Sequence, residues 1–223
     1  CRVSKRTLHS LAGASVCHCP DLFTSSLTMT SFASRFTLLS ALALLAAAPA
    51  AHAQQKPVPA QSSLSFVIKQ MGVPVEGQFK TFDAQVAFDP AKLASSRIGF
   101  TVEMGSATMG AKEVDVEMPK PVWLSALKFP QATFQSSAIK ALGGSKFEVQ
   151  GKLSIKGSAR DVTVPVTLAQ TGTAPNLATT ATGAFAIPRL AFKVGEAEWA
   201  DTSMVADEVQ VKFKLALSGV PKI

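Results

Sequence analysis

The sequence is poor in the side chains that most enzymes and metal sites use. It contains no tyrosine, and all of its cysteines and histidines precede Gln54. These residues are Cys1, Cys17, Cys19, His9, His18 and His52. From Gln54 onward the chain therefore lacks a thiol nucleophile, a disulfide, a histidine base and an imidazole or thiolate metal ligand. A fold formed by this part must be held together by its own apolar core.

The early residues carry the pattern of a secretory signal. Arg35 follows the first methionine, Met29, and precedes an uncharged apolar run over 36–48. That run is too short to span a bilayer well. Ala51-His52-Ala53 fits the small-x-small rule for cleavage. We predict cleavage after Ala53 and secretion into the periplasm.

These boundaries divide the chain into three parts. We expect residues 1–53 to comprise an upstream extension and the signal peptide, and residues 54–61 to form a flexible lead-in. A single domain is expected over residues 62–223, because about 160 residues suit one domain.

The net charge and the distribution of basic residues do not indicate a charged partner. The leader holds four basic residues and one acidic residue, so the predicted mature part keeps +4 of the formal net charge of +7. Its basic residues are scattered singly, without a basic run that contains aromatic residues. This pattern excludes an obvious nucleic-acid site.

The segment 129–168 carries the clearest pattern in the chain. Apolar and polar residues alternate over 134–138, 147–155 and 162–168, as in strands with one buried and one exposed face. The joints between these runs are short and contain glycine, which favours antiparallel hairpins. We therefore predict a three-stranded meander.

Similar alternation predicts five further strands. They are expected over 62–70, 75–89, 97–105, 178–187 and 207–218. The second of them is interpreted as one strand bent by a bulge at Gly77. The fold prediction is all-β, an eight-stranded antiparallel barrel, since about eight strands close around side chains or one slender ligand.

Two long segments, 105–128 and 188–206, lack this alternation. Pro121 suits the first turn of a short helix over 121–127. We predict one or two short helical segments that cap an end of the barrel.

Several short motifs, taken in order along the chain, resemble the YceI-like family of polyisoprenoid-binding proteins. The matching residues are Ser65–Gly72 (SFVIKQMG), Gly77–Phe79 (GQF), Trp123, Phe129–Phe134 (FPQATF), Gly151–Gly157 (GKLSIKG), Val162–Val166 (VTVPV), Arg189, Phe192 and Asp207–Val209 (DEV). The resemblance covers nearly all of residues 62–218. It implies a lipocalin-like barrel around an apolar tunnel.

Two departures from the family pattern concern polar groups. Many members have histidine where this chain has Gln70, and many have an Arg-Asp-x-His stretch where this chain has Glu113, Asp115 and Glu117. The missing groups affect polar head-group contacts and leave the apolar tunnel unchanged.

The resemblance implies a non-enzymatic periplasmic carrier for a long isoprenoid lipid of quinone or polyprenyl type, with no other cofactor. The alternative is a ligand-free barrel that acts as a structural or interaction module. The partners considered are the lipid or quinone itself, a membrane b-type cytochrome and a second copy of the chain.

The candidate ligand-binding residues are mostly large apolar side chains of the predicted strands and of the segments between them. They are Phe66, Ile68, Met71, Phe79, Phe82, Phe100, Val102, Met104, Trp123, Leu127, Phe134, Phe185, Arg189 and Phe192. Which parity of each strand faces inward is not visible in one sequence, so packing in a filled core is the competing interpretation.

Polar side chains give three weaker hypotheses. Lys69 and Arg189 are candidates to face a polar head group, with solvated charge as the alternative. Ser125 and Lys128 form an S-x-x-K motif without its usual S-D-N and K-T-G partners, so we predict no catalytic site. The acidic residues of 113–117 are expected to be solvated, and we predict no metal site.

Overall fold

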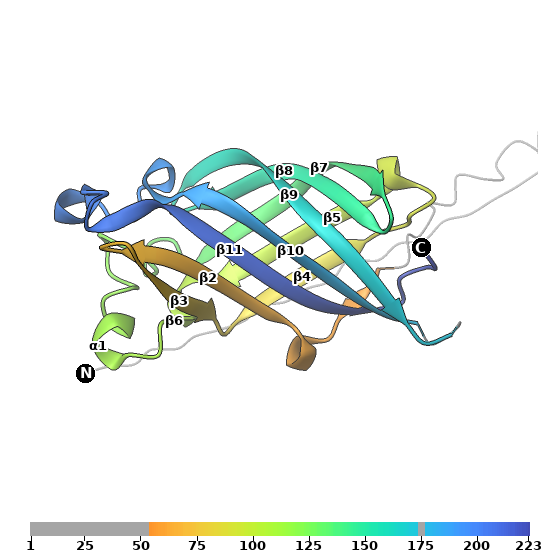
Figure 1. The fold of residues 1–223 in the computed structure, drawn as a ribbon, viewed down its shortest axis with the longest axis horizontal. Helices are drawn as coiled ribbons and strands as arrows, with labels where there is room; N and C mark the ends of the chain where they lie inside the picture. The colour runs from red at the N-terminus through yellow and green to blue at the C-terminus, as the bar shows by residue number, and fades with distance from the viewer. Residues whose placement is uncertain (1–53, 174–176) are drawn as a thin grey trace, which may run out of the picture. The chain divides into compact units, whose positions relative to one another are not determined.

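Antiparallel strands make up most of the part that the computed structural model describes, residues 54–173 and 177–223 (Figure 1). Eleven strands form one sheet within these ranges. They are β1 (Lys56–Pro57), β2 (Ser63–Gln70), β3 (Val73–Phe79), β4 (Phe82–Ala87), β5 (Arg97–Glu103), β6 (Ala107–Thr108), β7 (Gln131–Gly143), β8 (Lys146–Ile155), β9 (Ser158–Thr171), β10 (Ala178–Pro188) and β11 (Val205–Ser218). The all-β, antiparallel prediction is confirmed. The predicted signal peptide and its cleavage site lie outside the described residues.

The sheet curls on itself, and its two ends meet along a seam. The hydrogen-bonded order is β4-β5-β7-β8-β9-β10-β11-β2-β3-β6, so β4 and β6 are the ends of the path. Where these ends approach each other, the Thr81 N–H just before β4 donates to the hydroxyl of Ser106 just before β6 (3.1 Å). We call the line between β4 and the β2–β3–β6 edge the seam.

The first strand covers the other end of the seam. β11 extends beyond the start of β2, and there β1 pairs with it through Lys56–Ser218 and Pro57–Leu217. The adjacent Gln55 forms an isolated antiparallel bridge with Val86 of β4. The segment 54–61, expected to be a flexible lead-in, therefore packs against the sheet, because β11 and β4 both offer it backbone partners.

The predicted count of eight strands is wrong. The expected bent strand over 75–89 is two strands, because the chain changes partners at Lys80–Thr81: β3 pairs with β2 and β6, whereas β4 pairs with β5. The short β1 and β6 are also additional. Gly77 lies in regular pairing with Phe66 rather than in a bulge. The observed irregularities fall instead in β7 and β11.

The predicted meander is confirmed as β7, β8 and β9. Its joints are two-residue turns, Gly144-Ser145 and Lys156-Gly157, and both residues of each turn have positive φ. Met71-Gly72 between β2 and β3 has the same signature. Positive φ at both central positions is what the type I′ hairpin turn requires, and this turn matches the natural twist of the strands.

A short helical segment lies in the expected stretch 105–128, but at a different place within it. The one α-helical turn within the described ranges is α1, Lys112–Asp115. The predicted helix over 121–127 is wrong: this stretch is a series of turns, and Ser125 has a φ of 51°. Short 3₁₀ turns complete the connections, at Pro59–Gln61, Leu93–Ser95, Met104–Ser106, Arg189–Phe192 and Ala197–Ala200. No helix of the described ranges is long and apolar enough to span a membrane.

Three phenylalanine rings lie against glycines of neighbouring strands. Phe66 is paired with Gly77, Phe213 is paired with Gly183, and the Phe134 ring lies over Gly151. A methyl group at any of these glycines would overlap the ring above it. Each glycine therefore lets an aromatic ring lie close to the sheet instead of projecting further inward.

Replacing Gly77 with alanine tests this packing. The Phe66 ring would have to leave its place, and forced repacking of this kind typically costs about 1–3 kcal/mol. We expect G77A to lower the free energy of unfolding by that amount in a urea titration. The matched control is G105A, because a Cβ at Gly105 meets no atom within 4 Å and surface changes usually stay within about 0.5 kcal/mol. Equal stability of the two variants would contradict the packing argument.

Candidate functional site

The inward face of the curled sheet surrounds a cavity of about 540 Å³. This volume lies within the range of small-molecule sites, roughly 300–1,000 Å³. Every strand from β2 to β11 except β6 contributes apolar side chains to its wall, mainly with the alternation that the sequence displays. The strand residues are Leu64, Phe66, Ile68, Phe79, Val86, Ile98, Phe100, Val102, Ala132, Phe134, Ile139, Phe147, Val149, Leu153, Ile155, Val164, Val166, Leu168, Ala181, Phe185, Ile187, Val209, Val211, Phe213, Leu215 and Leu217.

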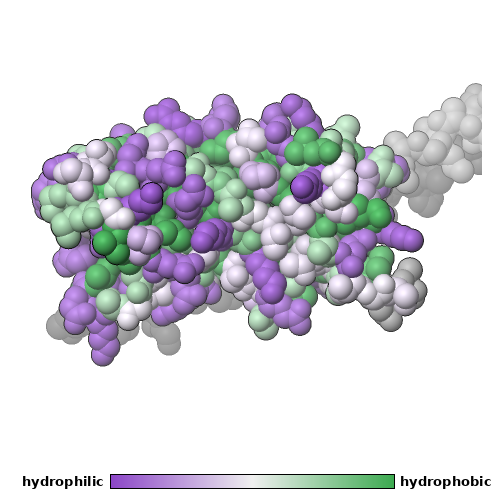
Figure 2. Space-filling view, in the orientation of Figure 1, coloured by the Kyte–Doolittle hydropathy of each residue, from purple (hydrophilic) through white to green (hydrophobic). Residues whose placement is uncertain are grey.

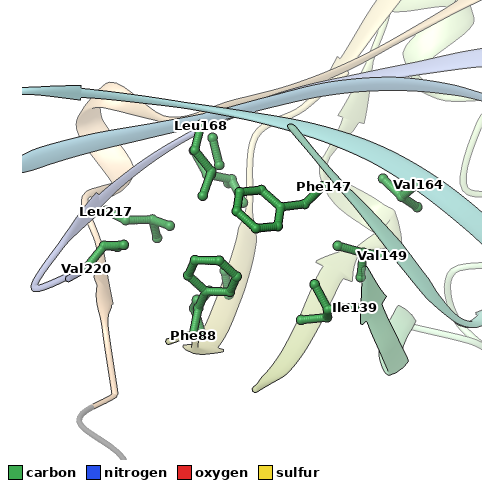
Figure 3. Packing of buried hydrophobic residues seen from close by; sticks show 12 residues of the cluster. Phe88, Ile139, Phe147, Val149, Val164, Leu168, Leu217 and Val220 are labelled. Carbon is green, nitrogen blue, oxygen red and sulfur yellow. The ribbon is translucent and has the colours of Figure 1, made fainter. Parts of the chain in front are cut away.

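One end of the cavity, its floor, is lined by buried apolar side chains. Phe88 and Phe147 meet edge to face with ring centres 5.2 Å apart, and Leu168, Leu217 and Val220 surround them (Figure 3). The buried side chain of Gln55 holds the backbone of Phe88 from outside. Its amide donates to the Phe88 carbonyl (3.2 Å), and its oxygen accepts from the Phe88 N–H (2.7 Å). Among the residues that the structure describes, the floor therefore offers no polar side chain to a bound molecule.

The opposite end, the mouth, carries the polar members of the wall. They are Gln70 at the end of β2, Glu113 of α1, Glu117 and Arg189. Glu117 is ion-paired with the exposed Lys120. A molecule that fills this site would bury an apolar body and keep a polar end near the mouth.

Arg189 is fully committed to the protein itself. Only 2% of its surface is exposed. All of its N–H groups donate to backbone carbonyls between 2.6 and 3.0 Å away, those of Val194, Gly195, Trp199, Val205 and Ala206. Burial lowers the pKa of Arg189, and the nearby Asp207 acts in the opposite direction. With its donors used in this way, Arg189 positions the connection from β10 to β11 and has no N–H left for a head group.

A second cation ties this connection to the segment before β7. The Lys156 ammonium donates to the Val122 carbonyl (3.3 Å) and forms an ion pair with Glu196 (2.9 Å). The Gly195 N–H also donates to the Val122 carbonyl (2.9 Å). These contacts bring Trp123 and Trp199 together with ring centres 5.3 Å apart, and both rings line the cavity.

The carboxylates of 113–117 do not converge. Asp115 accepts from the Thr108 hydroxyl (2.6 Å) and from the Met109 N–H (2.7 Å), and these bonds lower the pKa of Asp115. This anchor fixes α1 against β6, while Glu113 and Glu117 border the cavity. No group of three or more potential metal ligands occurs in residues 54–173 and 177–223.

The sequence-predicted site residues separate into two sets. Phe66, Ile68, Phe79, Phe100, Val102, Met104, Trp123, Phe134, Phe185, Arg189 and Phe192 all line the cavity. Met71, Phe82 and Leu127 do not. Phe82 stacks on Phe100 with ring centres 5.5 Å apart, Met71 is 78% exposed in its turn, and Leu127 is fully exposed.

Sequence reasoning missed much of the floor and the mouth. Alternation of apolar and polar residues could have identified some of them, because it continues through Phe147, Val149, Leu168, Leu215 and Leu217. Trp199 and Val220 lie in irregular segments, and no periodicity marks them. In β7 a bulge after Ser136 turns Ile139 inward, which interrupts the parity read from 134–138.

The structure gives little support to Lys69 as a head-group contact or to Ser125 and Lys128 as a catalytic pair. Lys69 is exposed and is not part of the cavity wall. Ser125 is buried in a turn, and the Lys128 ammonium lies 5.4 Å from the centre of the Phe129 ring.

Comparisons with known proteins agree with one another on the fold. The curled sheet is similar to the crystal structure of BcnA from Burkholderia cenocepacia, with a TM-score of 0.68 and 50% identity over 72% of this chain and 99% of that one. It is also similar to a polyisoprenoid binding domain from Saccharophagus degradans, with a TM-score of 0.55 and 11% identity over 75% and 98% of the two chains. The second likeness shows the fold alone.

Curated relatives match over shorter stretches. A protein named YceI from Salmonella arizonae is 29% identical over 63% of this chain and 73% of its own length. A UPF0312 protein from Vibrio cholerae is 27% identical over 47% of this chain, and the match spans 56% of that relative's length. The model of the YceI-like domain matches residues 56–217, which is most of the chain and nearly all of the curled sheet. The chain therefore belongs to the YceI-like domain family.

Proposed function

We propose that this protein is a periplasmic carrier that binds a long isoprenoid lipid, of quinone or polyprenyl type, in the cavity. The observation that supports this most is the division of the cavity wall. Its floor and sides are apolar, and its polar residues gather at one end. A lipid with a long apolar tail and a small polar head has the same division.

Energetics favour a long tail over a short one. Burying each CH₂ contributes about 0.8 kcal/mol, whereas association costs roughly 4–15 kcal/mol in lost freedom. One five-carbon unit contributes at most about 4 kcal/mol on this scale, which barely offsets the cost. Several units in line bind well, so the enclosure selects for length.

The comparisons support a lipid ligand without identifying it. The Saccharophagus degradans structure is described as a polyisoprenoid binding domain. That description belongs to a protein only 11% identical to this chain, so we take from it the class of ligand and test the class directly.

The periplasmic part of the proposal has a simple test. The signal pattern before Gln54 predicts that protein expressed from the full sequence in a Gram-negative host is recovered in the periplasmic fraction. Its mass should correspond to a chain that begins at Gln54. An uncleaved chain in the cytoplasm would contradict this location.

Tail length should determine affinity. The sequence has two tryptophans, Trp123 and Trp199, and both line the cavity. Quinones that enter should therefore quench the intrinsic fluorescence, and the dissociation constant should fall as isoprene units are added to the tail. A quinone ring without a tail is the control and should bind weakly. Organic extraction followed by mass spectrometry should recover an isoprenoid from the purified protein. Failure of both experiments would overturn the proposal.

A cavity-filling variant separates the carrier from the ligand-free module. Ala181 is buried in the wall near the floor, and A181F would place a ring in space that a ligand needs. We expect this variant to remain folded and to lose quinone binding. In a filled interior the same ring would be overpacked and would cost about 1–3 kcal/mol. The matched control is A184F, on the exposed face of the same strand. A large loss of stability in A181F alone would favour the interaction module, with a membrane b-type cytochrome or a second copy as partner.

A further inference from the structure

Large apolar side chains are exposed around the mouth of the cavity. Met71 lies in the β2–β3 turn and Val73 follows it, Val114 and Val116 lie in and just after α1, and Met204 precedes β11. We call these five residues the rim. Figure 2 shows hydrophobic residues among hydrophilic ones at the end of the molecule that carries α1 in Figure 1.

The rim is continuous with the cavity wall. Val114 lines the cavity, as do Gln70, which precedes Met71, and Glu117, which follows Val116. The Met71 N–H donates to the Met204 carbonyl (2.8 Å), which joins two of the three rim segments. An apolar surface thus leads from the exposed turn directly into the binding space.

Methionine is poorly suited to the backbone conformation at position 71. Its φ is 48° and that of Gly72 is 82°, and asparagine followed by glycine is the preferred pair for such a turn. A long unbranched side chain at positive φ is uncommon, and here it is also 78% exposed. Folding accounts for neither property, whereas contact with an apolar phase accounts for the exposed side chain.

Acidic residues outnumber basic ones on the rim segments. Over 69–73, 112–120 and 196–204, the basic residues Lys69, Lys112 and Lys120 stand against Glu113, Asp115, Glu117, Glu196, Glu198 and Asp201. A basic cluster that would attract anionic lipid head groups is not formed by these residues. The surface that suits the rim is therefore a zwitterionic phospholipid bilayer, contacted through apolar insertion.

We propose that the rim docks on the surface of a phospholipid bilayer and opens the mouth directly onto it. The docking itself is independent of any ligand; its use in lipid transfer rests on the proposed carrier function. A lipid tail then passes between bilayer and cavity without exposure of its whole length to water, which would otherwise oppose each transfer.

Sedimentation with phosphatidylcholine vesicles tests the docking. We expect the wild-type protein to sediment with the vesicles at moderate and high salt alike. The variant M71N/V73T/V116T should bind at least about tenfold more weakly, because binding strength scales with buried apolar area. L142T is the matched control and should bind like the wild type: Leu142 is as exposed as Val116, at 61%, and lies in the β7–β8 hairpin that leads to the floor.

The stability of the single variant M71N tests the argument from the turn independently. M71N places a residue that tolerates positive φ in the turn, so we expect the single variant to be at least as stable as the wild type in urea while its vesicle binding falls. A destabilised M71N would overturn the argument from the turn. Absence of wild-type binding, or an equal loss in L142T, would overturn the docking itself.

Quinone titration without vesicles separates this proposal from the carrier function. The rim variant should retain the tryptophan quenching of the wild type and should extract quinone from vesicles more slowly. If the wild-type protein binds vesicles but no quinone quenches its tryptophan fluorescence, docking is supported and the carrier function is rejected. One that binds quinone but extracts it from vesicles no faster than the rim variant would reject the role of docking in transfer.

Discussion

The central constraint on this molecule is that its interior must be apolar without being filled. Aromatic side chains provide the apolar surface, but each would occupy the space that it borders if it projected freely. Placing Phe66 and Phe213 opposite Gly77 and Gly183 lets both rings lie close to the neighbouring strand. The hydrophobic wall and the space inside it therefore depend on the same pairs of residues, and neither partner of a pair can be understood without the other.

The strands were largely predictable from the sequence, whereas their closure was not. Alternation over residues such as 147–155 reports that one face is buried, which is a local property of the backbone. The break at Lys80–Thr81 is invisible to this signal, because apolar side chains continue on both sides while only the hydrogen-bonding partner changes. The residues of β1 are too few to display a period at all. What the sequence lacked was information about pairing between distant segments.

The predicted site residues show the same division. Those on regular strands, such as Phe100 and Phe185, lie on the cavity wall where alternation suggested. Arg189 was a candidate to face a head group, with solvated charge as the alternative. Its five hydrogen bonds to carbonyls show that it organises a loop instead. Guanidinium groups serve both purposes, and only the positions of the surrounding carbonyls distinguish them. Trp199 depends on that loop, so its place beside Trp123 could not be inferred from spacing.

The seam gives the enclosure a property that a fully laddered cylinder lacks. Along most of its circumference, any change of width would break rows of backbone hydrogen bonds between long strands. Along the seam, the described residues join the opposing edges through the bonds of Thr81 with the Ser106 hydroxyl and through the bridge between Gln55 and Val86. The girth of the molecule can therefore adjust there at small energetic cost, while the eight ladders between adjacent strands from β4 to β3 remain intact. For the proposed carrier, a single weakly joined line would let one set of strands enclose ligands of different thickness.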